Sequence, residues 1–322
     1  MVTLLRRYCR AMTVLEAESL RRSFGERVAV DGVGFSIGPG DTYGLLGPNG
    51  AGKTTTISMV CGLLRPDGGT VRVHDHEMRV TRCEAKSHIG LVPQEVALYE
   101  DLSGRENLEL FGRLQGLGGR LLDQRVDEAL ELVGLVDRAA DRVGEYSGGM
   151  KRRCNIGAAL VHRPDLLILD EPTVGVDPQS RNAILAGIEE LRGVGMAVLY
   201  TTHYMEEAQR LCDRIGIMDQ GAMVAEGTTA ELVALVGRHP VIRLSGDGPL
   251  DAFVQAALGI DGVLNATEHE GRADVVAEVS ASLLSELLGL AERTGVRVGG
   301  VQVEAPDLED VFLHLTGKAL RD

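Results

Sequence analysis

The sequence predicts a large α/β domain with a mostly parallel β-sheet, followed by a small α+β domain. Up to about residue 236, short apolar runs of strand length alternate with helical patterns. Short buried runs that alternate with helices are typical of parallel sheets. Beyond residue 240 the order of the predicted elements changes. A chain of 322 residues is long enough for one large and one small domain.

Five apolar runs bounded by turn residues predict the strands of the large domain. They cover residues 43–46, 89–92, 166–169, 197–200 and 214–218. Helical periodicity between these runs predicts helices that include 54–63, 125–135 and 179–191.

The stretch 237–240, Gly-Arg-His-Pro, is predicted to be a linker because it breaks helices. After it we expect β-α-β-β-α-β, the order of a ferredoxin-like sandwich. The predicted elements are 241–244, 250–257, 263–268, 273–279, 283–294 and 296–303. A last amphipathic helix is expected at 307–315, with Asp307 as its N-cap. The predicted segments are thus an extension at 1–12, a large domain at 13–237 and an accessory domain at 238–322.

Charge and composition exclude several classes of protein. The net charge of −14 argues against a general nucleic-acid-binding role. The longest apolar stretches are far shorter than the about 20 residues of a membrane-spanning helix. Five scattered cysteines without a CxxC pair indicate neither a disulfide framework nor a cysteine zinc site, and favour a reducing cytosol. The N-terminus lacks the apolar region of a secretory signal, and both Met1 and Met12 stand as candidate start residues.

The strongest motif is Gly47 to Thr54, which reads GPNGAGKT and matches GxxxxGK[ST]. It follows a predicted strand and opens a predicted helix, the context of a phosphate-binding P-loop (Walker A). Glycines let backbone N–H groups turn toward phosphate, and the helix N-terminus adds partial positive charge. Lys53 is expected to reach the outer phosphates, and Thr54 to offer its hydroxyl to Mg²⁺. The predicted nucleotide contacts here are Gly47, Pro48, Asn49, Gly50, Ala51, Gly52, Lys53, Thr54 and Thr55.

A second motif is the apolar strand 166–169 followed by Asp170 and Glu171. We expect Asp170 to hold the metal ion, as the equivalent acidic residue does in P-loop NTPases. Glu171 is expected to accept a proton from the attacking water. Taken alone this pattern is weak, because acidic residues often end strands.

Four further segments follow in a fixed order and complete a family pattern. A lone Ser-Gly-Gly or a lone His is usually structural, but six segments in order are not. Together they resemble the Q-loop, signature, D-loop and H-loop of ABC ATPase domains, over about residues 14–231. These segments centre on Gln94, on Ser147-Gly148-Gly149, on Asp177 and on His203.

The resemblance implies a head-to-tail homodimer with two ATP molecules at its interface. Each ATP would lie between one subunit's P-loop and the signature of the other subunit. Ser147, Gly148 and Gly149 would then contact the γ-phosphate in trans, and Asp177 would communicate across the dimer.

The resemblance also implies roles within one subunit. Gln94 would reach the metal or the attacking water and sense a permease, and His203 would contact the γ-phosphate region. The implied catalytic residues are therefore Glu171, His203 and Lys53, and the implied Mg²⁺ ligands are Thr54, Gln94 and Asp170. Phe24 occupies the position of the adenine-stacking aromatic, although a core phenylalanine is the alternative.

Two features narrow the subfamily. Tyr146 replaces the leucine that usually begins the signature, and this variant resembles that of the drug- and antibiotic-exporter subgroup. Because the Ser-Gly-Gly that contacts ATP is retained, we expect ATPase activity to be kept. The ending 307–317, with the segment 175–181, resembles ATP-binding subunits of ABC-2 type exporters, the daunorubicin-resistance group among them. The apolar stripe of the last helix is also explained by core packing.

The resemblance therefore implies an ATP-binding and hydrolysing subunit of an ABC-2 type exporter, peripheral on the cytoplasmic face of the cell membrane. Closure of the dimer by ATP would power a separate permease that exports a drug, antibiotic or lipid-like molecule. The alternative is a soluble ABC ATPase acting on DNA or ribosomes. Such proteins usually carry two cassettes or a long inserted coiled coil, whereas this acidic chain shows one P-loop and no heptad run. A non-catalytic regulator is disfavoured because Lys53, Asp170, Glu171 and His203 are all present.

Overall fold

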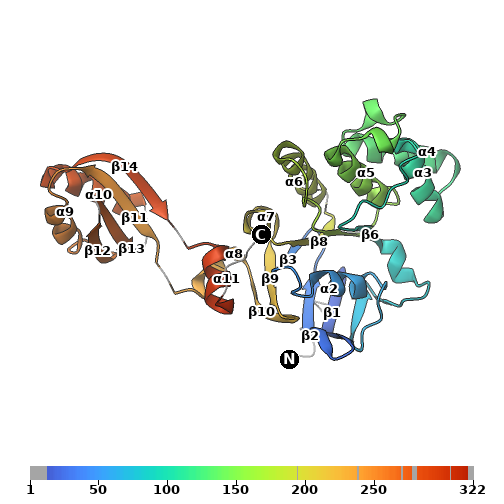
Figure 1. The fold of residues 1–322 in the computed structure, drawn as a ribbon, viewed down its shortest axis with the longest axis horizontal. Coiled ribbons are helices and arrows are strands. Elements are labelled where there is room, and N and C mark those ends of the chain that lie inside the picture. Colours follow the sequence, from blue (N-terminus) through green and yellow to red (C-terminus); the bar gives the residue numbers. More distant parts are fainter. Residues whose placement is uncertain are drawn as a thin grey trace. The chain divides into compact units, whose positions relative to one another are not determined.

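A computed structural model describes residues 13–193, 195–237, 239–269, 271–277, 281–304 and 306–317 (Figure 1). The described residues divide into two compact units, one up to Thr229 and one from Ala230 onward. This division comes before the predicted linker at 237–240. Most of the short helix α8, Thr229–Ala234, is therefore grouped with the second unit. The predicted extension at 1–12, with both candidate start residues, lies outside the described residues.

A six-stranded sheet forms the centre of the first unit, in the order β10-β9-β3-β8-β7-β6. The strands β6, β7, β8, β3 and β9 run parallel, and β10 is antiparallel to β9. All five strands predicted for this domain are present. Their bounds are β3 Thr42–Leu46, β6 Ile89–Val92, β7 Leu166–Asp170, β8 Ala197–Thr202 and β9 Arg214–Asp219, and the sixth strand, β10 Ala222–Gly227, was not predicted.

Both faces of this sheet are buried. On β7, Leu166 and Ile168 join one apolar core, while Leu167 and Leu169 join another on the opposite face. This explains why the strand reads as a continuous apolar run rather than an alternating one. The carboxyl ends of the parallel strands are therefore the free edge on which polar side chains can gather.

One face is covered by α2 (Lys53–Val60) and by an antiparallel sheet in the order β2-β1-β4-β5. In that sheet β1 pairs with both β2 and β4. The bounds are β1 Leu15–Phe24, β2 Arg27–Ile37, β4 Gly68–Val73 and β5 His76–Glu77. This sheet places the end of β1 near the start of α2.

Helices cover the other face (Figure 1). They are α3 Gly104–Leu114, α4 Gly119–Leu132, α5 Gly148–Leu160 and α6 Pro178–Gly193, with α7 Met205–Leu211 after β8. Three 3₁₀ turns lie at η1 Glu84–His88, η2 Val136–Arg138 and η3 Val143–Glu145. The helix predicted at 125–135 begins earlier and ends at Leu132. Gly134 has a left-handed φ of 62°, which stops the helix there.

The second unit contains an antiparallel sheet in the order β12-β13-β11-β14 with two helices packed on it. This order and the chain sequence β-α-β-β-α-β are those of the ferredoxin-like sandwich. Phe253, Leu287 and Val275 are fully buried in a core of its own. The bounds are α8 Thr229–Ala234, β11 Val241–Asp247, α9 Leu250–Ala257, β12 Val263–His269, β13 Arg272–Ala277, α10 Ala281–Thr294 and β14 Arg297–Glu304.

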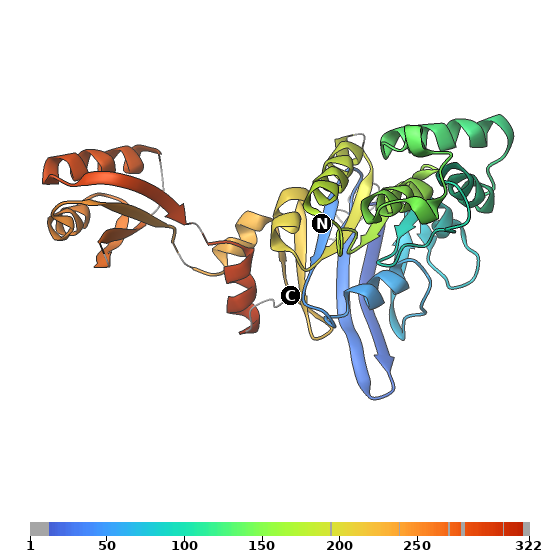
Figure 2. The same cartoon turned by 45° about the horizontal axis from the view of Figure 1, so that its top comes forward.

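The last helix is α11, Leu308–Thr316, and it lies beside α8 in both views (Figures 1 and 2). Asp307 caps it by accepting hydrogen bonds from the backbone N–H groups of Glu309 and Asp310. Val311 and Phe312 are buried but lie outside the apolar core of the sandwich. The stripe on α11 therefore buries apolar surface away from that core. Within the described part of the chain, every helix is too short or too polar to cross a membrane.

We expect the first unit to fold and bind nucleotide without the sandwich. Its two apolar cores consist of residues that precede position 224, so they do not need the later residues. A chain of residues 12–236 should be soluble and bind ATP with an affinity close to that of the full chain. Calorimetric titration measures this, and an insoluble product without ATP binding would show that the two regions depend on one another to fold.

Candidate functional site

The loop from Gly47 to Gly52 is fitted tightly between β2 and β9. A Cβ atom on Gly47 would lie 2.4 Å from the carbonyl oxygen of Met218. At Gly52 it would lie 2.6 Å from the carbonyl oxygen of Ala29, and the φ angle of 103° is left-handed. Neither position accepts a side chain, so packing requires glycine at both, and at Gly52 the backbone conformation requires it as well.

Lys53 opens α2 with its side chain only 4% exposed. Its ammonium group donates to the carbonyl oxygens of Gly47 at 2.7 Å and Pro48 at 3.2 Å. It also lies 3.0 Å from Oε1 of Glu171. The two carbonyl oxygens thus take two of the three N–H donors of the ammonium group, and Glu171 balances its charge at ion-pair distance.

A cavity of about 640 Å³ opens beside this loop. Most of the predicted nucleotide contacts line it, whereas Gly47 and Ala51 do not. Arg27 and Ala29 of β2 also line it, and no sequence motif marked them. The lining residues are Phe24, Arg27, Ala29, Pro48, Asn49, Gly50, Gly52, Lys53, Thr54, Thr55, Gln94 and Glu171.

Phe24 ends β1 at this cavity, and half of its surface is exposed. The guanidinium carbon of Arg22 lies 5.0 Å from the centre of its ring. The ring is therefore not a core residue, which removes the alternative explanation of Phe24. An exposed aromatic face at the wall of a cavity can stack on a flat ring of a ligand.

Asp170 and Glu171 follow β7 and are both almost fully buried. Thr201 on β8 organises them. Its hydroxyl donates to Oδ1 of Asp170 at 2.7 Å and accepts from the backbone N–H of Glu171 at 3.0 Å. Glu171 has a left-handed φ of 45°, an unfavourable conformation for a non-glycine residue that is typical of functional sites. The hydrogen bonds of Thr201 thus hold the two neighbouring carboxylates in a fixed arrangement at the end of β7.

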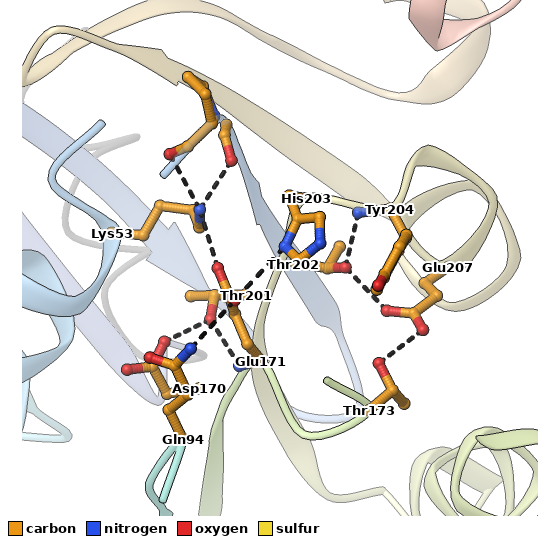
Figure 3. A network of polar contacts seen from close by, with 12 residues as sticks. Lys53, Gln94, Asp170, Glu171, Thr173, Thr201, Thr202, His203, Tyr204 and Glu207 are labelled. Atoms are coloured by element: carbon orange, nitrogen blue, oxygen red, sulfur yellow. Dashed lines mark hydrogen bonds and ion pairs between the residues drawn. The ribbon is translucent and has the colours of Figure 1, made fainter. Parts of the chain in front are cut away.

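Glu171 is the point where three predicted segments meet (Figure 3). Besides Lys53 at Oε1, the amide of Gln94 donates to Oε2 at 3.4 Å. Nδ1 of His203 lies 3.4 Å from the same Oε2, an ion-pair distance without the geometry of a hydrogen bond. The structure therefore brings the P-loop, the Q-loop, the strand-end carboxylates and the H-loop together around one side chain.

Arg152 holds the Q-loop segment from the side of α5. Its guanidinium is buried and donates to the carbonyl oxygens of Pro93 at 3.0 Å and Gln94 at 2.7 Å. Burial lowers the pKa of Arg152, but an arginine stays charged in proteins. In the sequence it is one residue of a short basic run, so nothing distinguished it from a surface charge.

Glu207 on α7 holds the H-loop in the same way (Figure 3). This carboxylate is 1% exposed and accepts four hydrogen bonds. The donors are Thr173 at 2.6 Å, Arg181 at 2.7 Å, Tyr200 at 2.9 Å and Thr202 at 2.7 Å. A buried carboxylate with this many donors is well satisfied. It fixes the end of β8, from which His203 projects.

Ser147 and Gly148 of the signature segment are exposed, whereas Gly149 is buried. Ser147 caps α5 by accepting from the backbone N–H of Met150. A Cβ atom on Gly149 would lie 2.1 Å from the hydroxyl oxygen of Ser180, so the signature and the start of α6 are in close contact. Asp177 accepts from the backbone N–H of Ser180, which lowers its pKa. The described residues that line the cavity include neither Ser147, Gly148 and Gly149 nor Asp177.

Tyr146, the departure from the usual signature, is a buried residue of the helical layer. Its hydroxyl donates to the carbonyl oxygen of Arg138 at 2.7 Å, and burial raises its pKa. A Cβ atom on Gly104 would lie 2.3 Å from that hydroxyl. The tyrosine thus fits because position 104 is glycine.

Comparison with known proteins supports one family. Residues 30–174 match the family described as ABC transporter. A linearmycin resistance ATP-binding protein, LnrL of Bacillus subtilis strain 168, is 46% identical over 96% of this chain and 100% of that protein. The daunorubicin resistance ATP-binding protein DrrA3 of Streptomyces coeruleorubidus is 41% identical, over 95% of this chain and 97% of that protein.

Two further similarities agree with these. The Nod factor export ATP-binding protein I of Paraburkholderia xenovorans strain LB400 is 39% identical, over 96% of this chain and 98% of that protein. A solved structure of the ATP-binding subunit of an ABC transporter is 30% identical, with a TM-score of 0.64. It covers 70% of this chain and 94% of that one.

The contact between Gly104 and Tyr146 generates a testable prediction. Gly104→Ala should lower the free energy of unfolding by about 1–3 kcal/mol, because the new methyl group overlaps the tyrosine hydroxyl. In a Tyr146→Phe background the same change should cost much less. Urea unfolding of the four proteins of this cycle measures the coupling, and strictly additive effects would contradict the proposed overlap.

Tyr146→Leu should change the ATPase rate only a few-fold, since Ser147, Gly148 and Gly149 remain.

Proposed function

Because the chain belongs to the ABC transporter family of ATP-binding subunits, and is accordingly an ATPase, we propose that it drives export through a separate membrane permease. The observation that carries this proposal is the convergence of Lys53, Gln94 and His203 on Glu171. These side chains come from four separate segments, and each is of the type that phosphoryl transfer to water requires.

Export, rather than import or work on nucleic acid, is supported by the relatives. Resistance and export ATP-binding proteins resemble this chain along almost its whole length, the sandwich included. We infer a drug, antibiotic or lipid-like substrate and a permease of the ABC-2 type. The subunit would then sit in the cytoplasm, peripheral on the inner face of the cell membrane. The net charge of −14 further disfavours the alternative that acts on DNA or ribosomes.

The residues of the cavity fit ATP. The exposed ring of Phe24 would stack on the base, and the glycine-rich loop, the start of α2 and Lys53 would bind the phosphates. Thr54, Gln94 and Asp170 offer the oxygen ligands that Mg²⁺ prefers. When bound, that ion would neutralise charge on the phosphate oxygens.

We propose that Glu171 accepts a proton from the attacking water. Its carboxylate is buried, and His203 and Gln94 lie beside Oε2. A phosphate oxygen that binds Lys53 would compete with the Glu171 carboxylate for the charge of the ammonium group, which donates hydrogen bonds to Gly47 and Pro48. We infer that nucleotide binding loosens the contact of Lys53 with Glu171 and so makes the carboxylate available to water.

The exposed signature supports a site completed by a second copy of the chain. Ser147 and Gly148 lie at the surface and outside the lining of their own cavity. In a head-to-tail homodimer they would face the partner's phosphates, with Asp177 at the same contact. Closure of that dimer by ATP, and its release after hydrolysis, would supply the movement that the permease uses.

We expect Glu171→Gln to abolish nearly all hydrolysis while ATP binding persists. The amide keeps the shape of the side chain but cannot accept the proton. Phosphate release measures the rate, and a sizing column in ATP should show the variant as a dimer. Hydrolysis at a near wild-type rate would exclude Glu171 as the base.

We expect Ser147→Arg to stop hydrolysis without unfolding the protein, because its effect falls on the partner's site. Lys53→Ala should lose most nucleotide affinity, since a charge-assisted contact to phosphate is removed. Mixing the two inactive variants should restore part of the activity, because a mixed dimer has one intact composite site. If either variant alone keeps full activity, the composite site does not exist.

A further inference from the structure

Two histidines and an aspartate gather at the end of the six-stranded sheet opposite the nucleotide cavity. Asp165 immediately precedes β7, His88 immediately precedes β6, and His74 immediately follows β4. The cavity-side carboxylates lie at the other end of β7, Leu166–Asp170. At the rise of an extended strand, the two ends are about 17 Å apart. This cluster is therefore separate from the nucleotide site.

The three side chains point at one another. Nδ1 of His88 lies 2.6 Å, and Nε2 of His74 3.3 Å, from the same oxygen, Oδ2 of Asp165. One ligand atom from each residue lies within 4.8 Å of the other two. In a tetrahedral zinc site, with bonds of about 2.0–2.1 Å, neighbouring ligand atoms are about 3.4 Å apart. Modest side-chain rotations thus bring the three atoms around one ion.

Backbone pairing holds the three residues in this arrangement. The N–H of Asp165 donates to the carbonyl oxygen of His88 at 3.0 Å, and its own carbonyl oxygen accepts from Ala197 at 3.2 Å. The N–H of His74 donates to the carbonyl oxygen of Val14 at 2.8 Å. His74 also has a left-handed φ of 51°, a conformation that non-glycine residues seldom adopt and that clusters at ligand sites.

We propose that His74, His88 and Asp165 form a binding site for a divalent transition-metal ion of the zinc type. Two imidazoles and one carboxylate are a ligand set that suits Zn²⁺, and three protein ligands leave a position for water. The side chains are 38%, 29% and 52% exposed, so an ion can enter. The ring of His76 stacks on that of His88 with centroids 5.7 Å apart and supports its orientation.

A bound ion would join the antiparallel sheet, through His74, to two strands of the central sheet. Exposed histidine–aspartate pairs alone contribute little to stability. An ion that binds only the folded arrangement stabilises it by mass action. The site therefore predicts a zinc-dependent gain in stability of the first unit that is independent of ATP.

The test uses the full chain, treated with a chelator, free of nucleotide and titrated with Zn²⁺ by calorimetry. The wild type should bind one Zn²⁺ tightly at this site. The double variant His74→Ala, His88→Ala should bind it about a hundredfold more weakly, and Asp165→Asn at least about tenfold more weakly. The matched control is His269→Ala, an exposed histidine of β12, which should bind as the wild type does. Unchanged ATP affinity shows that each variant is folded.

A second readout is thermal unfolding. Zn²⁺ should raise the Tm of the wild type and of His269→Ala, but not that of the double variant. If the double variant fails to fold, Asp165→Asn decides, because it keeps the size of the side chain. The proposal is wrong if the wild type shows no saturable Zn²⁺ binding, or if Asp165→Asn binds Zn²⁺ as tightly as the wild type.

Discussion

The buried contact between Lys53 and Glu171 is the interaction on which the rest of the site depends. It joins the phosphate-binding loop to the strand-end carboxylates inside one unit, with both side chains almost fully enclosed. Because Glu171 balances the charge of the Lys53 ammonium group at ion-pair distance, a phosphate group that binds Lys53 would compete with Glu171 for the same positive charge. We infer that recognition of ATP and release of the base are coupled through this one ammonium group.

Each residue around this pair is held by a second, buried interaction. Thr201 fixes the two carboxylates, Arg152 fixes the backbone at Gln94, and Glu207 fixes the end of β8 before His203. Thr201, Arg152 and Glu207 belong to β8, α5 and α7, whose other buried side chains mainly pack in the core. A shift of α5, which carries the signature at its start, would therefore reach the base through Arg152 and Gln94. This is a physical route by which a partner subunit could influence hydrolysis.

The motifs could be predicted from short stretches of sequence. The residues that hold these motifs in place could not. Lys53 and Glu171 belong to short motifs that each follow an apolar strand. Because the predicted sheet is parallel, both motifs were expected at the same edge of it, the one formed by the carboxyl ends of the strands. Arg152 looks like a surface charge because its partners lie far away in the chain, and Glu207 does so because Thr173 and Arg181, two of its four partners, are also distant. Tyr146 looked like a tolerated exchange, yet its fit depends on Gly104. The early end of α4 reflects Gly134, whose left-handed conformation overrides the apolar periodicity. The roles of the site residues and the independence of the sandwich remain predictions.

We infer that bound ATP draws Lys53 away from Glu171. A crystal structure of the unchanged chain with a non-hydrolysable ATP analogue and Mg²⁺ tests this inference, because the carboxylate of Glu171 is kept. We expect Nζ of Lys53 to lie within hydrogen-bond distance of phosphate oxygens and no longer to contact the side chain of Glu171, with the partner subunit's signature at the same nucleotide. If Lys53 still contacts position 171 beside bound ATP and makes no phosphate contact, the claim is wrong.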